Sequence, residues 1–262
     1  MTISIFLILI ISGLFVGFIN TLSAGGTAIS IALYLALGFS PSEANATNRI
    51  GVLLQTSLTV PLFARKGYLK QTYIFRLAIP TMIGALTGSV LSILLPEMLF
   101  SYFMGISLLV MIIFLFRSPK KFEEDDESKT KNGINTLQYL TFFLIGVYGG
   151  FVQVGTGFLL MAAGSMLLGY NIIKTNAVKI TVMALYTIVA VLVFWSEGTI
   201  HWQYGLIHSI GTFIGSFIAT KLAFQKGSRF VRWIVIFVVI FTSLSLFKIV
   251  DLQQIFQNLL LK

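Results

Sequence analysis

The chain contains long runs without a charged residue, and these runs constrain its fold more than any other feature. No Asp, Glu, Lys or Arg occurs from Met1 to Ser42. A helix needs about 20 apolar residues to cross a bilayer, so the chain is predicted to be an all-α, polytopic membrane protein. Further uncharged runs cover residues 50–64, 77–96, 98–116, 137–173, 180–196, 198–220 and 234–247.

Composition agrees with this prediction and excludes several functions. The chain is 56% hydrophobic and 10% charged, whereas a typical soluble domain has about 25% charged residues. The net charge of +9 is assigned to Lys and Arg in cytoplasmic loops, not to nucleic-acid binding. Cysteine is absent, which excludes disulfides and thiol catalysis. The first apolar run has no basic n-region or small-residue cleavage site, so it is expected to be a retained helix in the cytoplasmic membrane.

The second half of the chain repeats the first around a glycine-rich break. Residues Gly17–Gly26 (GFINTLSAGG) have a counterpart in Gly150–Gly157 (GFVQVGTG). Glycine and small polar residues inside an apolar helix favour a break. An offset of 133 pairs Gly150 with Gly17, and an offset of 131 pairs the later positions. These later pairs include Gly157 with Gly26, Gly169 with Gly38, Asn176 with Asn45 and Gly215 with Gly84.

The loop charges predict how the two halves insert. The loop with Arg65, Lys66 and Lys70 corresponds to a loop around Glu197 that has no Lys or Arg. The bias is reversed after the next helix, where Glu97 stands against the basic segment 221–232. By the positive-inside rule the repeats should be inverted. The charged linker is then cytoplasmic and both termini lie outside.

We therefore expect two inverted five-helix repeats with 8–10 membrane helices in all. In each repeat the first two helices form a hairpin around the break, as broken or re-entrant helices near the midplane. Whether this hairpin crosses the whole membrane is left open. In the first repeat, Gly38 and the turn Ser40-Pro41 are expected to end the second helix, and the third helix is expected to begin at about Glu43. The expected divisions are the first repeat (1–116), the linker (117–136), the second repeat (137–248) and an amphipathic C-terminal tail (249–262).

Polar residues within these apolar segments form the candidate substrate site, because polar groups are costly in a membrane unless they are buried or hydrated. One group lies at the breaks, and a second opens the third helix of each repeat, where helix N-termini and cations suit a small anion. The alternatives are helix packing for the first group and a boundary or snorkelling role for the cations. The candidates are Asn20, Ser23, Gly25, Gly26, Gln153, Gly155, Thr156 and Gly157 at the breaks, and Asn45, Asn48, Arg49, Asn176 and Lys179 on the third helices.

Few residues could carry other chemistry. His208 is the one group deep in an expected span that titrates near neutral pH, so it is a candidate for a proton-linked role, with hydrogen-bonded packing as the alternative. Two histidines without cysteine make a metal site improbable. No nucleophile motif or P-loop is present. We expect no enzyme activity, no catalytic residue and no cofactor.

Two segments resemble a known family. Residues 17–49 (GFINTLSAGGTAISIALYLALGFSPSEANATNR) and 149–181 (GGFVQVGTGFLLMAAGSMLLGYNIIKTNAVKIT) are similar to the TauE/SafE sulfite exporter family, also called TSUP. The resemblance covers essentially the whole chain. It implies a membrane permease for small sulfur-containing or organic anions such as sulfite, sulfoacetate or related sulfonates, acting as an exporter.

Two other functions remain open from the residues alone. One is a membrane-embedded enzyme or assembly factor, and the other is an anion channel. The expected partners are the small anionic substrate and the lipid bilayer, without nucleic acid. The oligomeric state is open, with a homodimer as one option.

Overall fold

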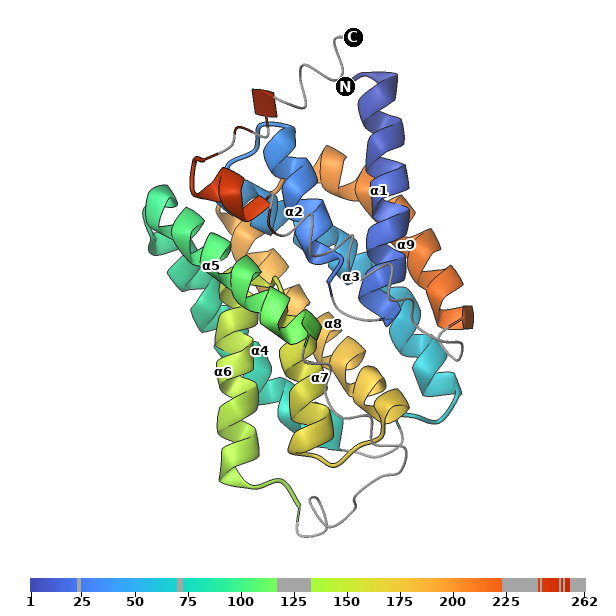
Figure 1. Cartoon of the computed structure of the whole chain (residues 1–262). Coiled ribbons are helices and arrows are strands. Elements are labelled where there is room, and N and C mark those ends of the chain that lie inside the picture. Colours follow the sequence, from blue (N-terminus) through green and yellow to red (C-terminus); the bar gives the residue numbers. More distant parts are fainter. Residues whose placement is uncertain are drawn as a thin grey trace.

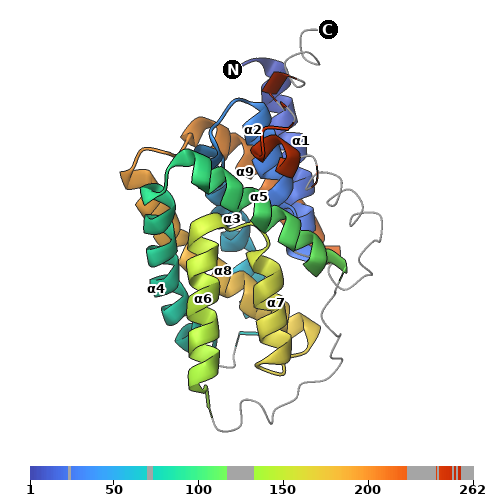
Figure 2. The ribbon, with the colours of Figure 1, turned by 60° about the vertical axis from the view of Figure 1, so that its left-hand side comes forward.

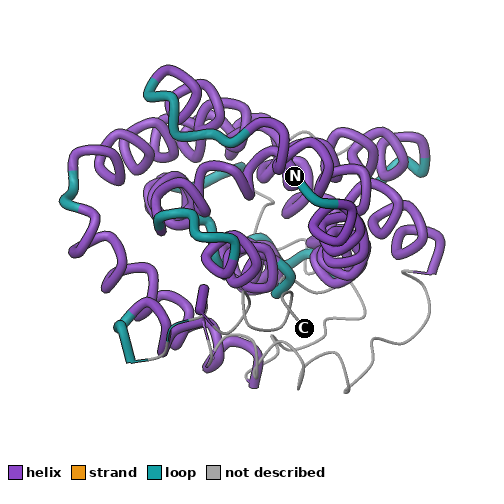
Figure 3. The backbone as a smooth tube through the Cα atoms, turned by 90° about the horizontal axis from the view of Figure 1, so that it is seen from above, coloured by secondary structure: helices purple, strands orange, loops and turns teal. Residues whose placement is uncertain are grey.

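The protein is described by a computed structural model that covers residues 1–22, 25–69, 73–116, 133–222, 240, 242–249, 251 and 253–254. Within these ranges it contains helices and turns but no strand, so the all-α prediction is confirmed (Figure 1; Figure 3). Residues 117–132 of the linker 117–136, and most of the tail 249–262, lie outside the described residues. The helices are α1 (Ile3–Leu22), α2 (Thr27–Ala36), α3 (Pro41–Arg65), α4 (Tyr73–Leu94), α5 (Glu97–Phe116), α6 (Thr136–Val152), α7 (Thr156–Met166), α8 (Ile172–Ser196) and α9 (Trp202–Leu222).

Local sequence signals fix the start of α3. Ser40 is the N-cap, and its side chain and that of Glu43 form a capping box. Pro41 is the first helical residue, a position where its missing N–H costs nothing. The expectation that Ser40 and Pro41 form a turn before a helix starting near Glu43 was therefore wrong by about one half-turn. Asn171 caps α8 at the corresponding position of the second half.

The lengths of the half-helices α2 and α7 decide whether the second arm of each hairpin can cross a bilayer. They contain 10 and 11 residues, which at 1.5 Å per residue gives about 15 Å. The hydrocarbon core of a bilayer is about 30 Å thick. Neither helix is long enough to cross it, so α1–α2 and α6–α7 are hairpins with one short arm.

The two hairpins open toward opposite ends of the molecule. In Figures 1 and 2 the α1–α2 hairpin opens at the top, beside the N-terminus, whereas α6–α7 opens at the bottom. An inverted repeat requires such an arrangement. The repeat relationship and the orientation of the chain in a membrane stay predictions.

Each long hairpin arm packs on a helix from the other half through glycines. A Cβ on Gly13 or Gly17 of α1 would collide with the backbone oxygens of His208 or Thr212 on α9. Likewise, a Cβ on Gly146 or Gly150 of α6 would collide with the backbone of α4. Small residues let membrane helices approach this closely. These four glycines therefore serve helix packing, and they define two seams, α1–α9 and α4–α6.

The outer surface of the bundle is apolar. Among the described residues, three helices are long and apolar enough to cross a membrane, namely Ile3–Thr21, Tyr73–Leu94 and Ile172–Ser196. Shorter apolar helices accompany them. Large apolar side chains such as Phe15, Ile79 and Leu192 are exposed on these helices, as expected of a lipid-facing surface. The number of 8–10 membrane helices stays a prediction.

Candidate functional site

The two breaks expose uncapped helix N-termini in the middle of the bundle. The N-cap residues Gly26 of α2 and Gly155 of α7 make no side-chain capping hydrogen bond. Before α7, Gln153 and Gly155 both have positive φ, 40° and 76°, and only glycine adopts this region without strain. A helix N-terminus carries partial positive charge, although the N–H groups of Ala28 and Thr156 already donate to the backbone oxygens of Gly25, at 3.4 Å, and Gln153, at 3.2 Å.

A cation from the first half binds the end of the broken helix in the second half. Arg49 of α3 donates hydrogen bonds from its two terminal nitrogens to the backbone oxygens of Gly149, at 3.0 Å, and Gly150, at 2.6 Å. Its guanidinium also lies 4.8 Å from the ring centre of Phe194. Asn45, one turn earlier, donates to the backbone oxygen of Phe151 at 3.0 Å. Positive charge is favourable at a helix C-terminus, so α3 stabilises the end of α6.

The second half of the chain makes an equivalent contact with the first half. Lys179 of α8 donates from Nζ to the backbone oxygen of Asn20 at 3.1 Å, and Asn176 donates to that of Thr21 at 3.4 Å. The end of α1 is thus bound by α8 as the end of α6 is bound by α3. Asn45 and Asn176 are partners in the 131-residue register.

Both cations are completely buried, and this excludes the snorkelling alternative. The side chains of Arg49 and Lys179 are 0% and 1% exposed. A boundary residue would extend its charged end to headgroups or water, whereas these two point into the breaks.

Each break also contains a buried amide side chain. Asn20 and Gln153 are 6% and 1% exposed, and neither Asn20 Nδ2 nor Gln153 Nε2 has a hydrogen-bond partner among the described residues. Asn48 donates to Gln153 Oε1 at 3.4 Å. A buried donor without a partner costs about 1–3 kcal/mol. Asn20 and Gln153 correspond in the 133-residue register, so both breaks present one such donor.

The structure brings most of the predicted residues together. Asn45, Asn48 and Arg49 meet the second break, and Asn176 and Lys179 meet the first. Gly25, Gly26 and Gly157 are buried at the starts of α2 and α7. Thr156 is buried, and its hydroxyl donates to the backbone oxygen of Gln153 at 2.8 Å. Ser23 lies outside the described residues.

His208 is not at the breaks. It is buried on α9, beside Gly51 of α3, with its ring centre 5.6 Å from that of Tyr34 on α2. Neither ring nitrogen has a hydrogen-bond partner among the described residues. The hydrogen-bonded packing role considered for it therefore finds no support there.

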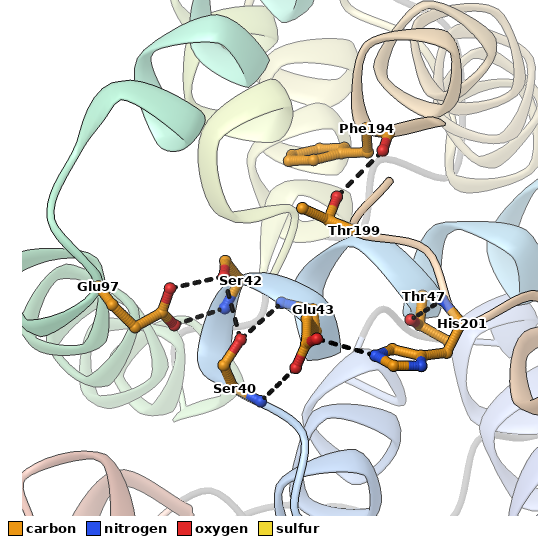
Figure 4. A network of polar contacts seen from close by, with 8 residues as sticks. All are labelled: Ser40, Ser42, Glu43, Thr47, Glu97, Phe194, Thr199 and His201. Carbon is orange, nitrogen blue, oxygen red and sulfur yellow. Dashed lines mark hydrogen bonds and ion pairs between the residues drawn. The ribbon is translucent and has the colours of Figure 1, made fainter. Parts of the chain in front are cut away.

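Sequence reasoning missed a polar network at one end of the bundle (Figure 4). Glu97, at the start of α5, accepts hydrogen bonds from the backbone N–H of Ser42 at 2.9 Å and from its hydroxyl at 2.6 Å. Glu43 pairs with His201 Nε2 at 2.9 Å. The network joins the α2–α3, α4–α5 and α8–α9 turns. The capping motif Ser40-Pro-Ser-Glu43 was a visible signal for its centre, but its partners are distant in sequence.

No group of three His, Cys, Asp or Glu side chains suited to a metal ion occurs in the part of the chain that the structure describes. The chemistry of the breaks is instead that of N–H donors, amides and two cations. Such groups recognise anions.

These features define a class of protein. Short half-helices that meet inside an apolar bundle, with polar groups at their N-termini, are typical of membrane transporters. The chain belongs to the sulfite exporter TauE/SafE family, whose sequence model matches residues 9–246. The family resemblance in the sequence is therefore confirmed.

Several bacterial proteins described as transporters are similar to this chain along most of its length. "Probable membrane transporter protein ORF9" of a Sinorhizobium species is 24% identical, over 91% of this chain and 90% of that protein. A "Probable membrane transporter protein" of Haemophilus influenzae is 27% identical, over 87% of this chain and 89% of its own length. "Probable membrane transporter protein YfcA" of Escherichia coli K12 is 26% identical, over 85% and 82%.

Proposed function

We propose that this membrane permease moves small sulfur-containing or organic anions, such as sulfite, sulfoacetate or related sulfonates, and that it acts as an exporter in the cytoplasmic membrane. The substrate binds between the two breaks. The name of the family, sulfite exporter, supports the substrate class.

One observation carries the proposal: the two unpartnered amide donors, Asn20 Nδ2 and Gln153 Nε2, are buried beside the uncapped N-termini of α2 and α7. A bound anion would accept hydrogen bonds from both amides, and the partial positive charge at the N-termini of α2 and α7 would favour it. Lys179 and Arg49 add positive charge nearby, although both also bind backbone oxygens. No carboxylate of the described residues contacts these groups through a hydrogen bond or ion pair.

Export agrees with the energetics of the membrane potential. A monoanion that leaves a negative interior gains about 2.3 kcal/mol per 100 mV. Export therefore needs no carboxylate-based carrier for a driving ion, and the sequence offers none within its expected spans.

The other two functions are less well supported. An enzyme or assembly factor needs a nucleophile and base within hydrogen-bond reach, and the breaks offer amides and cations instead. A channel would use the same groups with different gating, and transport kinetics distinguish it from a permease.

The proposal is tested by flux of labelled sulfite in proteoliposomes at imposed potentials. We expect efflux that rises with interior-negative potential and saturates with sulfite concentration, whereas a channel would not saturate in this way. Asn20→Ala and Gln153→Ala should each reduce flux about ten- to a hundredfold, because a hydrogen bond to a charged ligand is worth about 1.5–3 kcal/mol and each 1.4 kcal/mol is about tenfold. The absence of potential-sensitive flux for sulfite and for a panel of sulfonates would reject the function.

Lys179→Gln tests the cation, and Lys174→Gln serves as its matched control. Lys174 lies one turn into α8 over the ring of Tyr170, 4.5 Å from its centre. We expect Lys179→Gln to lower flux strongly at normal protein yield and Lys174→Gln to leave flux unchanged. Equal losses from both variants would argue against a role in substrate binding.

A further inference from the structure

A second buried polar cluster lies away from the breaks, between α2, α3 and α9. We define this inner polar cluster as Ser30, Tyr34 and His208, each 0% exposed. Ser30 and Tyr34 share one face of α2, four residues apart. The Ser30 hydroxyl, the Tyr34 hydroxyl and both nitrogens of His208 have no hydrogen-bond partner among the described residues. Four unpartnered polar atoms in one part of a membrane bundle indicate a ligand that binds there, because each costs about 1–3 kcal/mol when unsatisfied.

The cluster exists in only one half of the chain. In the 131-residue register, Met161 stands at the position of Ser30 and Leu77 at that of His208. The counterpart of Tyr34 is Ser165, so no imidazole or phenol stands at any of the three positions, and Leu77 is completely buried. The breaks are matched between the halves, whereas this cluster is not. It therefore serves something other than the symmetric anion site.

A column of rings connects the cluster to the end of the bundle shown in Figure 4. The ring of His201 stacks on Phe39 with 4.1 Å between centres, and Phe39 stacks on Tyr34 at 5.6 Å. Tyr34 in turn lies 5.6 Å from His208. His201 and its partner Glu43 are 40% and 34% exposed, so an exposed titratable pair lies near the buried cluster, with the Phe39 ring, which carries no proton, between them. The corresponding position to Glu43 in the second half is Lys174.

The ligand that fits is a proton. Two hydroxyls and an imidazole contain a strong proton acceptor and two groups that can donate to or accept from water. They contain no fixed charge for a metal ion or an anion.

We propose that His208 binds a proton that enters from the end carrying Glu43 and His201, and that this proton moves inward as the anion moves outward. The inference rests on the proposed function for the anion half of the exchange. The imidazole lone pair takes the proton from water at that end and returns it to water on the opposite side. Only the N–H bond forms and breaks, and nothing is oxidised.

Few other groups can titrate around His208. α1, which packs against α9, carries no titratable side chain. On α3, Glu43 is paired with His201, and Arg49 points away to the end of α6. The remaining titratable side chains on the elements packed around α9 are Tyr34 of α2, Arg65 of α3, and Tyr204 and Lys221 of α9 itself.

The first experiment tests proton binding without any substrate. The chain has two histidines, so His201→Gln leaves a single imidazole whose nitrogen NMR signals belong to His208. In the full-length detergent-solubilised variant, we expect these signals to report protonation within pH 4–8. A ring that stays neutral over this whole range would overturn the proposal.

The second experiment tests coupling. Proteoliposomes loaded with a sulfonate of constant charge as its potassium salt are given an outward gradient, valinomycin lets K⁺ leave and balance the charge, and the internal pH is followed with a trapped dye. We expect sulfonate efflux to be accompanied by proton entry. His208→Gln and Tyr34→Phe should lower proton entry at least tenfold per sulfonate moved, and Tyr68→Phe, on the α3–α4 turn, should not change it. Efflux without proton entry, or protons that leave together with the anion, would overturn the proposal.

The design separates this inference from the proposed function. If no small anion moves but His208 titrates, the anion function fails and proton binding stands. If the anion moves while His208→Gln keeps full proton coupling, the function stands and the inference fails. Tyr34→Phe changes one hydroxyl only, so it gives a result even if His208→Gln does not fold.

Discussion

The guanidinium of Arg49 lies 2.6 Å from the backbone oxygen of Gly150, a residue 101 positions further along the chain. A second hydrogen bond joins it to Gly149. The contact crosses between the two halves at the point where α6 ends, and Lys179 and Asn20 make its counterpart at the end of α1. Each half of the chain therefore stabilises the broken helix of the other.

Removal of Arg49 should destabilise the protein. Arg49→Ala removes two hydrogen bonds from a buried cation and should cost about 1.5–3 kcal/mol, because the backbone N–H of Gln153 still donates to the Gly149 oxygen and the Ser89 hydroxyl to the Gly150 oxygen. Arg49→Lys should recover only part of the loss. Lysine keeps the positive charge, but its ammonium group lacks the planar fork that reaches both oxygens. Thermal unfolding in detergent measures this order. Equal stability of wild type and Arg49→Ala would contradict the assigned contact.

The glycine seams should tolerate no side chain. Gly17→Ala and Gly150→Ala would drive a Cβ into the backbone of Thr212 and Ala85, and such overpacking costs about 1–3 kcal/mol or more. Gly105→Ala is the matched control, since the nearest atoms to its Cβ belong to the Phe247 ring, which can move. We expect folded yield, measured by size-exclusion chromatography, to fall for the first two variants. A loss for Gly105→Ala as large as theirs would argue against the seams.

Glu97 should anchor the α4–α5 corner to the first turn of α3. Glu97→Ala removes two acceptor contacts to Ser42 and should cost about 1 kcal/mol, because the pair is exposed to solvent. Glu197→Ala, in the exposed α8–α9 turn, serves as the control. The midpoint of thermal unfolding should fall for the first variant and stay within error for the second.

The absence of cysteine makes the orientation easy to measure. Single cysteines at Thr2 and Glu197 should react with an impermeant maleimide from outside intact cells, while those at Lys66 and Thr136 should react only after permeabilisation. All four positions are exposed in the structure. Labelling of Thr2 and Thr136 from the same side would reject the predicted orientation.

Much of the fold could be read from local patterns. The uncharged runs predicted helices, because a segment that enters lipid must satisfy its backbone hydrogen bonds internally. The glycine-rich stretches predicted the breaks, and the register predicted which residues correspond. The start of α3 was misplaced by two residues because Pro41 was assigned to a turn, although it also fits the first position of a helix.

The sequence predicted which polar residues could form the site, but not their partners. Arg49 near the start of a span has the same local pattern whether it marks a membrane boundary or binds a helix end. Likewise, nothing local distinguishes a packed His208 from one whose nitrogens have no partner, and nothing connects Glu43 to His201 across 158 residues.

The sequence by itself therefore determined the helical membrane class, the two glycine-rich breaks and the polar residues available at them. Tertiary structure alone decided that the cation of each half binds the end of the broken helix in the other half. It also decided that α2 and α7 are too short to cross a bilayer, and that His208 packs against Tyr34. The physical reason is that apolar length and helix breaks are local properties of a segment. The partner of a buried charge or imidazole depends on which distant helix packs against it.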